Sequence, residues 1–187
     1  MSRNKRISRG KIINPSFFVF CEGQTEELYI CHLRSKYRLP IMVDAKIAGN
    51  RITEGYIKNY KRNKETHPKD KTYLVYDLDV AEMLGKLQAI KNVKLLCSKP
   101  CFELWYLLHF QELKSEITSE GCFNKLQDHL QIYKKGVMGN KLKEKLEEKQ
   151  AKAVNRASKL VAFNNPSSLV YVLINDMEEV KKQKTQI

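Results

Sequence analysis

The sequence predicts an α/β protein with a parallel β-sheet core that is flanked by helices and followed by a helical C-terminal extension. Between residues 15 and 97, short apolar segments of β type alternate with amphipathic segments, which is typical of right-handed βαβ units. From Pro100 onward the pattern turns helical. We therefore expect three parts, namely a basic arm at residues 1–14, an α/β core at 15–110 and a helical extension packed on the core at 111–187.

Four segments of the core have the composition of buried strands. Residues 17–21 read Phe-Phe-Val-Phe-Cys after a proline, and residues 72–76 form the clearest of the four. Residues 42–48 and 93–97 complete the set. Helices are expected between them, at 25–37, 53–62 and 80–90, with Thr25 and Thr53 as candidate N-caps.

The extension is expected to consist of helices. Pro100 should open an apolar helix over residues 101–110, and further helices are expected at 121–132, 142–163 and 167–182. The sequence Asn164-Asn165-Pro166-Ser167 should supply a turn and an N-cap before the last of these helices.

Composition restricts the class of protein. Of 187 residues, 42% are hydrophobic and 29% are charged, which is ordinary for a folded globular chain. No apolar run approaches the roughly 18 residues that a bilayer-spanning helix needs, and the basic N-terminus lacks the apolar stretch of a secretory signal. We expect a cytoplasmic protein without a membrane partner. The five cysteines form no Cys-x-x-Cys pair, so we expect reduced, buried thiols and no zinc site.

The net charge of +13 points to a polyanionic partner. Two clusters of cations suit a nucleic-acid-binding face, although a soluble, lysine-rich surface is the plainer alternative. A third cluster, at residues 134–152, is diluted by glutamates and suits a solvated helix. The candidate nucleic-acid-binding residues are Arg3, Lys5, Arg6 and Arg9 in the arm, and Lys58, Lys61, Arg62 and Lys64 in the core.

Carboxylates follow two of the expected strands. Glu22 comes directly after the first strand, and Asp77 and Asp79 follow the third. Because parallel strands end at one edge of a sheet, these side chains should converge, and Glu26 lies one helical turn beyond Glu22. Oxygen-only ligands of this kind suit Mg²⁺ or Mn²⁺. Such an ion beside basic residues is the arrangement that hydrolyses or transfers phosphodiesters.

Structural explanations exist for three of the acidic residues. Asp79 and Glu82 match a helix capping box, so Asp79 could merely cap the next helix. Glu26 lies in a first helical turn, where the helix dipole favours a negative charge without any function. Glu103 is surrounded by apolar neighbours in Phe-Glu-Leu-Trp-Tyr-Leu-Leu, so it is either a paired structural residue or a further group at the site.

Four segments resemble the RloB-like family over about residues 16–175. They are Cys-Glu-Gly-Gln-Thr-Glu-Glu-Leu-Tyr (21–29), Tyr-Asp-Leu-Asp (76–79), Ser-Lys-Pro-Cys-Phe-Glu-Leu-Trp-Tyr-Leu-Leu-His-Phe (98–110) and Asn-Pro-Ser-Ser-Leu-Val-Tyr (165–171). The first two also resemble the Toprim catalytic core of topoisomerases, primases and OLD-type nucleases. Lys99 and Leu78 depart from the family pattern, which usually has asparagine and a polar or basic residue at these places.

The resemblance implies a Toprim-like or Rossmann-like core whose metal ligands are Glu22, Asp77 and Asp79, with Glu26 serving a second ion. It also implies defence against bacteriophage by abortive infection, together with an ATPase partner. The leading hypothesis is therefore a Mg²⁺-dependent nuclease that acts on RNA, including tRNA, or on DNA. Glu103 and Lys99 are candidates for additional site residues. The alternative is a non-catalytic subunit that binds nucleic acid or an ATPase.

Overall fold

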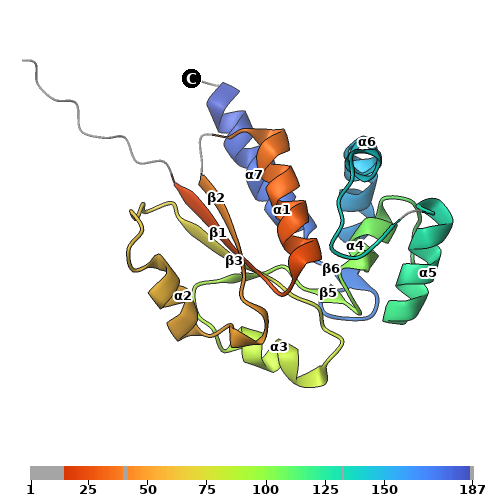
Figure 1. The fold of residues 1–187 in the computed structure, drawn as a ribbon, viewed down its shortest axis with the longest axis horizontal. Helices are drawn as coiled ribbons and strands as arrows, with labels where there is room; N and C mark the ends of the chain where they lie inside the picture. Colours follow the sequence, from red (N-terminus) through yellow and green to blue (C-terminus); the bar gives the residue numbers. More distant parts are fainter. Residues whose placement is uncertain (1–14, 40–41, 132, 186–187) are drawn as a thin grey trace, which may run out of the picture.

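The computed structural model describes residues 15–39, 42–131 and 133–185, and the basic arm with its four candidate cations lies outside these ranges. A parallel sheet forms the centre of the fold, in the strand order β2-β1-β3-β4 (Figure 1). Its strands are β1 (Ser16–Cys21), β2 (Met42–Ile47), β3 (Lys71–Val75) and β4 (Lys94–Leu95). The fold class predicted from the sequence is therefore confirmed.

Each face of the sheet has its own hydrophobic core, because alternate residues of a strand point to opposite faces. Phe17 and Val19 of β1 pack with α1 (Gln24–Tyr37) and with the helices of the C-terminal half. Phe18 and Phe20 pack on the other face, with Ala48 and Ile52, which flank the 3₁₀ turn Gly49–Arg51, and with α2 (Glu54–Lys61) and α3 (Ala81–Gln88). β1 is buried along its whole length, which explains its unbroken run of apolar residues.

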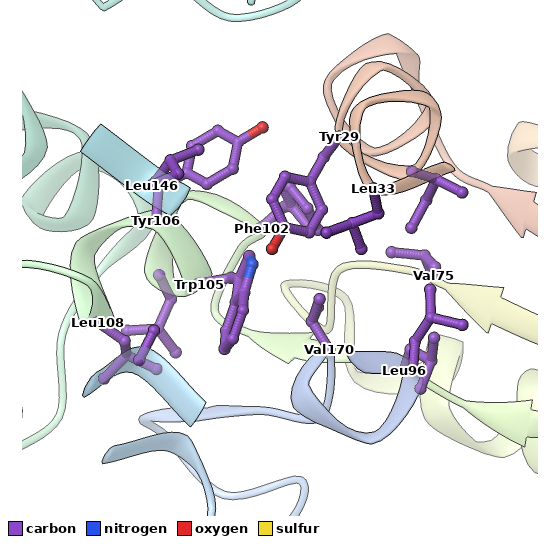
Figure 2. Close-up of a cluster of buried hydrophobic side chains, with 14 of the residues drawn as sticks. Tyr29, Leu33, Val75, Leu96, Phe102, Trp105, Tyr106, Leu108, Leu146 and Val170 are labelled. Carbon is purple, nitrogen blue, oxygen red and sulfur yellow. The ribbon is translucent and has the colours of Figure 1, made fainter. Parts of the chain in front are cut away.

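The C-terminal half contributes α4 (Glu103–Leu108), α5 (Ser119–His129), α6 (Asn140–Ala157) and α7 (Tyr171–Thr185). Figure 2 shows how the aromatic side chains of α4 join these helices to the sheet. Trp105 and Phe102 pack against Tyr29 of α1, with ring centroids 6.2 and 5.8 Å apart, in a cluster that also contains Val170. The block Phe-Glu-Leu-Trp is therefore the hydrophobic anchor between the two halves of the chain.

The two largest differences from the predicted elements lie in the C-terminal half of the chain. The helix expected at 142–163 is α6, which begins at Asn140 and ends at Ala157. The segment expected to open the last helix is instead a short strand, β6 (Ser167–Ser168), which pairs antiparallel with β5 (Ser98–Lys99). α7 begins only at Tyr171, because the backbone of residues 167–168 is used in this pairing.

Smaller differences concern the other element limits and the caps. The fourth strand is confined to Lys94–Leu95, and the helices expected at 101–110 and 121–132 cover 103–108 and 119–129. Thr53 caps α2 as predicted, with its hydroxyl accepting the N–H of Tyr56 at 3.0 Å. Thr25 does not cap α1, since Gly23 holds the N-cap position. In the described part of the chain, no helix has the length and apolar character that a membrane span requires.

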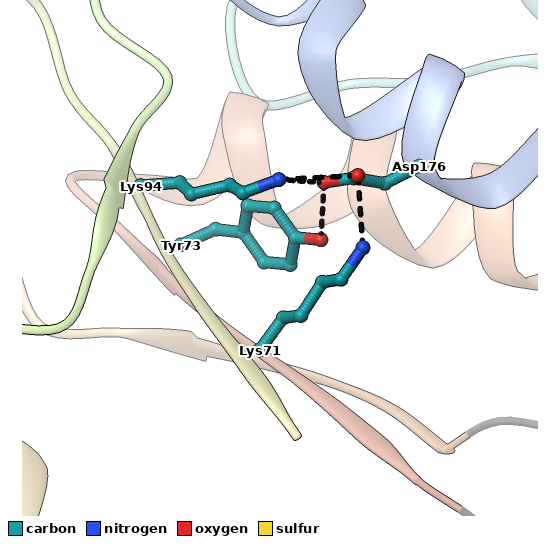
Figure 3. Close-up of polar contacts among 4 residues, drawn as sticks. All are labelled: Lys71, Tyr73, Lys94 and Asp176. Atoms are coloured by element: carbon teal, nitrogen blue, oxygen red, sulfur yellow. Dashed lines mark hydrogen bonds and ion pairs between the residues drawn. The ribbon is translucent and has the colours of Figure 1, made fainter. Parts of the chain in front are cut away.

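Asp176 joins α7 to the amino ends of strands β3 and β4. Figure 3 shows its carboxylate accepting hydrogen bonds from Tyr73 at 2.7 Å, Lys71 at 2.9 Å and Lys94 at 2.8 Å. Burial alone would raise the pKa of Asp176, but these three donors outweigh burial and hold the pKa below its ordinary value. The carboxylate thus ties strands β3 and β4 to the last helix.

Replacing Asp176 with alanine should lower the free energy of unfolding by about 2 kcal/mol, because the buried hydroxyl of Tyr73 and two ammonium groups lose their acceptor. Urea denaturation followed by circular dichroism measures the change. Asp128→Ala is the matched control, since Asp128 is exposed on α5. Equal losses in the two variants would contradict the structural role assigned to Asp176.

Candidate functional site

Glu22 and Asp77 meet at the carboxyl ends of the two central strands. β1 and β3 pair in parallel up to Cys21 and Val75, so the residues that follow leave the sheet at the same edge. The N–H of Glu22 donates to the carbonyl of Val75 at 3.0 Å, and the Glu22 carboxylate accepts the N–H of Asp77 at 2.8 Å. The convergence predicted for these two residues is therefore present.

The backbone of Asp77 is held by hydrogen bonds, while one oxygen of its carboxylate lacks a partner among the described residues. Asp77 forms a parallel bridge with Ser98, and the N–H of Leu78 donates to the carbonyl of Ser98 at 2.8 Å. Its Oδ1 atom is buried and has no hydrogen-bond partner among the described residues. Burial, together with the charges of Glu26, Glu22 and other nearby groups, raises the pKa of Asp77 to about 9.

Glu26 faces the same edge from the first turn of α1. Only 6% of its surface is exposed, and its Oε2 atom accepts the N–H of Gly23 at 3.1 Å. This bond supplies part of the helix cap that Thr25 had been expected to provide. Burial raises the pKa of Glu26, and the charges of Glu22 and Glu103 raise it further. Glu26 therefore both caps α1 and belongs to the acidic cluster.

Glu103 reaches the cluster from the start of α4 and is 2% exposed. The hydroxyl of Tyr133 donates to its Oε1 at 3.0 Å, and the ammonium of Lys135 lies 3.4 Å from its Oε2. Both oxygens thus have partners, which removes the cost of an unpaired buried carboxylate. The charge of Glu103 also contributes to the raised pKa values of Glu26 and Asp77. It is both a paired structural residue and a member of the cluster.

The partners of Glu103 come from residues 133–139, a segment between α5 and α6 that we call the strap. The strap crosses the N-terminus of α1, where the N–H of Gly136 donates to the hydroxyl of Thr25 at 2.9 Å. Lys135 is 61% exposed, and its charge acts on Glu22 and Asp77 as well as on Glu103. The strap therefore places one cation beside the cluster of acids.

Gly136 allows the strap to make this close approach. Its φ angle is +68°, and an added Cβ atom would lie 3.0 Å from the side chain of Gln24. We expect Gly136→Ala to lower the free energy of unfolding by about 1–2 kcal/mol. Gly85→Ala is the control and should be neutral or slightly stabilising, because this helical glycine has open space around it. Chemical denaturation measures both, and equal effects would contradict the account of the strap.

The remaining candidates lie nearer the surface. Asp79 is exposed. Burial is the main cause of the raised pKa of Glu22, and the charge of Asp79 raises it further. The capping explanation of Asp79 is wrong, since Val80 holds the N-cap position of α3 and Asp79 makes no cap. Lys99 lies on β5, directly after the residue that pairs with Asp77. Among the described residues, no three histidine, cysteine, aspartate or glutamate side chains are grouped closely enough to hold a metal ion as they stand.

The basic residues of the core divide into two kinds. Lys58 and Arg62 are exposed. Lys61 donates to the side chain of Thr72 and lies 4.5 Å from the ring centre of Phe18, and Lys64 forms an ion pair with Asp44. α2, which carries Lys58 and Lys61 and ends just before Arg62, packs on the face opposite α1 (Figure 1). Their role in nucleic-acid binding stays a prediction, as does that of the arm.

Sequence reasoning missed Tyr133 and Lys135 as residues of the site. The signal was the short sequence Tyr133-Lys134-Lys135-Gly136, in which an aromatic residue and two cations precede a glycine outside any helical pattern. Its lysines had been grouped with the Glu/Lys-rich helix that follows. Only the tertiary fold brings this segment back to α1 and α4.

The fold and the site define an α/β protein with an acidic cluster at the carboxyl edge of its parallel sheet. The chain belongs to the RloB-like protein family, whose sequence pattern matches residues 17–177. A comparison with curated proteins found no match. Among solved structures, the C-terminal region of the Burkholderia pseudomallei OLD protein is similar at 14% identity and a TM-score of 0.37, covering 92% of this chain and 99% of that one.

Proposed function

We propose that the protein is a Mg²⁺-dependent nuclease that cleaves phosphodiester bonds of RNA, including tRNA, or of DNA. The observation that carries the proposal is the carboxylate of Asp77, which is partly buried, lacks a partner at Oδ1 and is surrounded by other acids. Carboxylates crowded in this way are stabilised by a cation between them. An oxygen-only donor set of this kind fits Mg²⁺ or Mn²⁺.

In this proposal, Glu22 and Asp77 hold the ion, Asp79 completes its ligands, and Glu26 serves a second ion. The side chains would have to move inward, because no three of them are grouped for binding as they stand. A bound Mg²⁺ would neutralise the phosphate and lower the pKa of a water ligand. The negative charge of Glu103 would add to that of these ligands. Lys99, which follows the residue paired with Asp77, would lie at the edge of the site.

The chain's own residues have separate roles in cleavage. The hydrogen bond from the backbone N–H of Asp77 to the Glu22 carboxylate would orient Glu22 toward the end of β3, beside Asp77. Lys135, held near Glu103 and largely exposed, would donate to a phosphate oxygen and balance its developing charge. Tyr133 holds Glu103 in place.

Membership of the RloB-like family and the acidic site together support a wider proposal. The core would be Toprim-like, and the protein would act in the cytoplasm in defence against bacteriophage by abortive infection, together with an ATPase partner. A non-catalytic nucleic-acid-binding or ATPase-binding subunit is the alternative, and the lack of three grouped ligand side chains among the described residues is consistent with it.

Incubation of the purified protein with total tRNA, single-stranded RNA and DNA tests the proposal. We expect cleavage of at least one substrate in Mg²⁺ or Mn²⁺ and none in EDTA. A preparation that binds these substrates but cleaves none of them with either metal would favour the non-catalytic alternative. Cleavage that persists undiminished in EDTA would contradict the metal-dependent mechanism.

A further inference from the structure

Two adjoining hollows are lined in part by the strap, and their linings include none of the carboxylates of the acidic cluster. The first has a volume of about 460 Å³ and lies between the end of α5 and the start of α6, with Lys134, Lys141 and Lys145 in its lining. The second has a volume of about 510 Å³ and includes Phe123 and Lys135. Gln131, Tyr133 and Lys134 line both hollows, so the two form one continuous surface that we call the strap groove.

The charge of the strap groove suits a polyanion. Lys134, Lys141 and Lys145 are exposed in the first hollow, where Asp128 is the acidic residue of the lining. The ammonium of Lys145 donates to the carbonyl of His129 at 3.3 Å, which keeps it at the wall of the hollow. Several lysines that line one depression supply the positive charge that binds a phosphate backbone.

The second hollow has the chemistry of a nucleobase pocket. Phe123 is partly exposed and stands beside the ring of Tyr133, with centroids 5.8 Å apart. Gln127 and Gln131 also line the hollow, and their amides can donate to and accept from the edge of a base. A base can reach an aromatic side chain and two amides in this way only when it is unstacked and unpaired, which is the state found in single strands.

The strap groove leads to the acidic cluster. Tyr133 lines both hollows and donates to Glu103 at 3.0 Å, while Lys135 lines the second hollow and lies 3.4 Å from Glu103. We propose that the strap groove binds a single-stranded segment of nucleic acid, with phosphates at Lys134, Lys141 and Lys145 and a base beside Phe123. The inference rests on the proposed function, because it makes the bound strand the substrate of the neighbouring carboxylates.

Binding without cleavage tests the strap groove. Fluorescence anisotropy in EDTA, with a short fluorescein-labelled RNA or DNA single strand as the probe, compares the wild type with Lys141→Gln/Lys145→Gln. We expect about tenfold weaker binding, and a salt dependence of the binding constant whose slope falls by about 1.4, or 0.7 for each lost phosphate contact. The matched control is Lys152→Gln/Lys182→Gln, which removes the same charge from exposed positions of α6 and α7.

A second variant addresses the base pocket. Phe123→Leu keeps an apolar side chain against the core but removes the stacking surface, so single-strand binding should weaken about five- to a hundredfold while duplex binding stays unchanged. Equal effects of the two double-lysine variants, or no effect of Phe123→Leu, would overturn the inference. Failure of the proposed function would look different, namely as intact binding in EDTA without cleavage in Mg²⁺.

Discussion

Asp77→Asn should reduce Mg²⁺-dependent cleavage by at least about a hundredfold, because loss of one anionic ligand removes several kcal/mol of charge stabilisation in the transition state. Asparagine has nearly the shape of aspartate, and the N–H of residue 77 can still donate to Glu22, so the fold should be preserved. Initial rates of cleavage of a labelled substrate at saturating Mg²⁺ measure the effect.

The control for this experiment is Glu82→Gln, which neutralises an exposed carboxylate in the first turn of α3. Its cleavage rate should match that of the wild type. Circular dichroism of both variants establishes that each is folded. A folded Asp77→Asn protein that cleaves within about threefold of the wild-type rate would contradict the role of Asp77 as a metal ligand.

In EDTA, the contribution of Asp77 to the free energy of unfolding should fall as the pH rises from 5 to 8. The pKa of Asp77 in the folded protein is about 9, above the ordinary value of 3.8, so the folded state keeps a proton that the unfolded chain loses. The resulting stabilisation is complete below about pH 4 and is lost as the pH rises toward 9. One such proton changes the free energy of unfolding by up to about 1.4 kcal/mol per pH unit.

Denaturation curves of the wild type and of Asp77→Asn across this pH range isolate the contribution of Asp77. The variant has no carboxylate to titrate, so it should lose less stability with rising pH than the wild type. Glu22 and Glu26, whose pKa values are raised, and His32 and His109, whose pKa values are lowered, contribute slopes of opposite sign to both proteins. The difference between the two curves therefore reports on Asp77. Parallel curves for the two proteins would show that the carboxyl group of Asp77 titrates normally.

The central strands and the positions of Glu22 and Asp77 could be predicted from sequence because their signals are local. Strands buried on both faces need unbroken apolar runs, and the residue after each run must emerge at the edge of the sheet. Thr53 could be identified as a helix cap because a cap is also a local signal, formed with a residue three positions later. Cys21 and Val75 end the two central strands within a residue of the expected positions.

The features that sequence reasoning missed depend on contacts between distant segments. Ser167 was expected to begin a helix, yet it lies in a strand and pairs with Lys99, which is 68 residues earlier in the sequence. The strap reaches the N-terminus of α1 through Gly136 and Thr25, which are 111 residues apart. Periodicity carries no information on such pairings, so Tyr133 and Lys135 could be assigned to the site only from the fold.

Direct titration with Mn²⁺ tests the claim that the acidic cluster at the sheet edge binds a divalent cation. The electron paramagnetic resonance signal of free Mn²⁺ disappears on binding, so the titration needs no substrate. We predict saturable binding to the wild type, competition by Mg²⁺, and at least about tenfold weaker binding to Glu22→Gln and Asp77→Asn. Wild-type binding that is no tighter than that of these two variants would contradict the account.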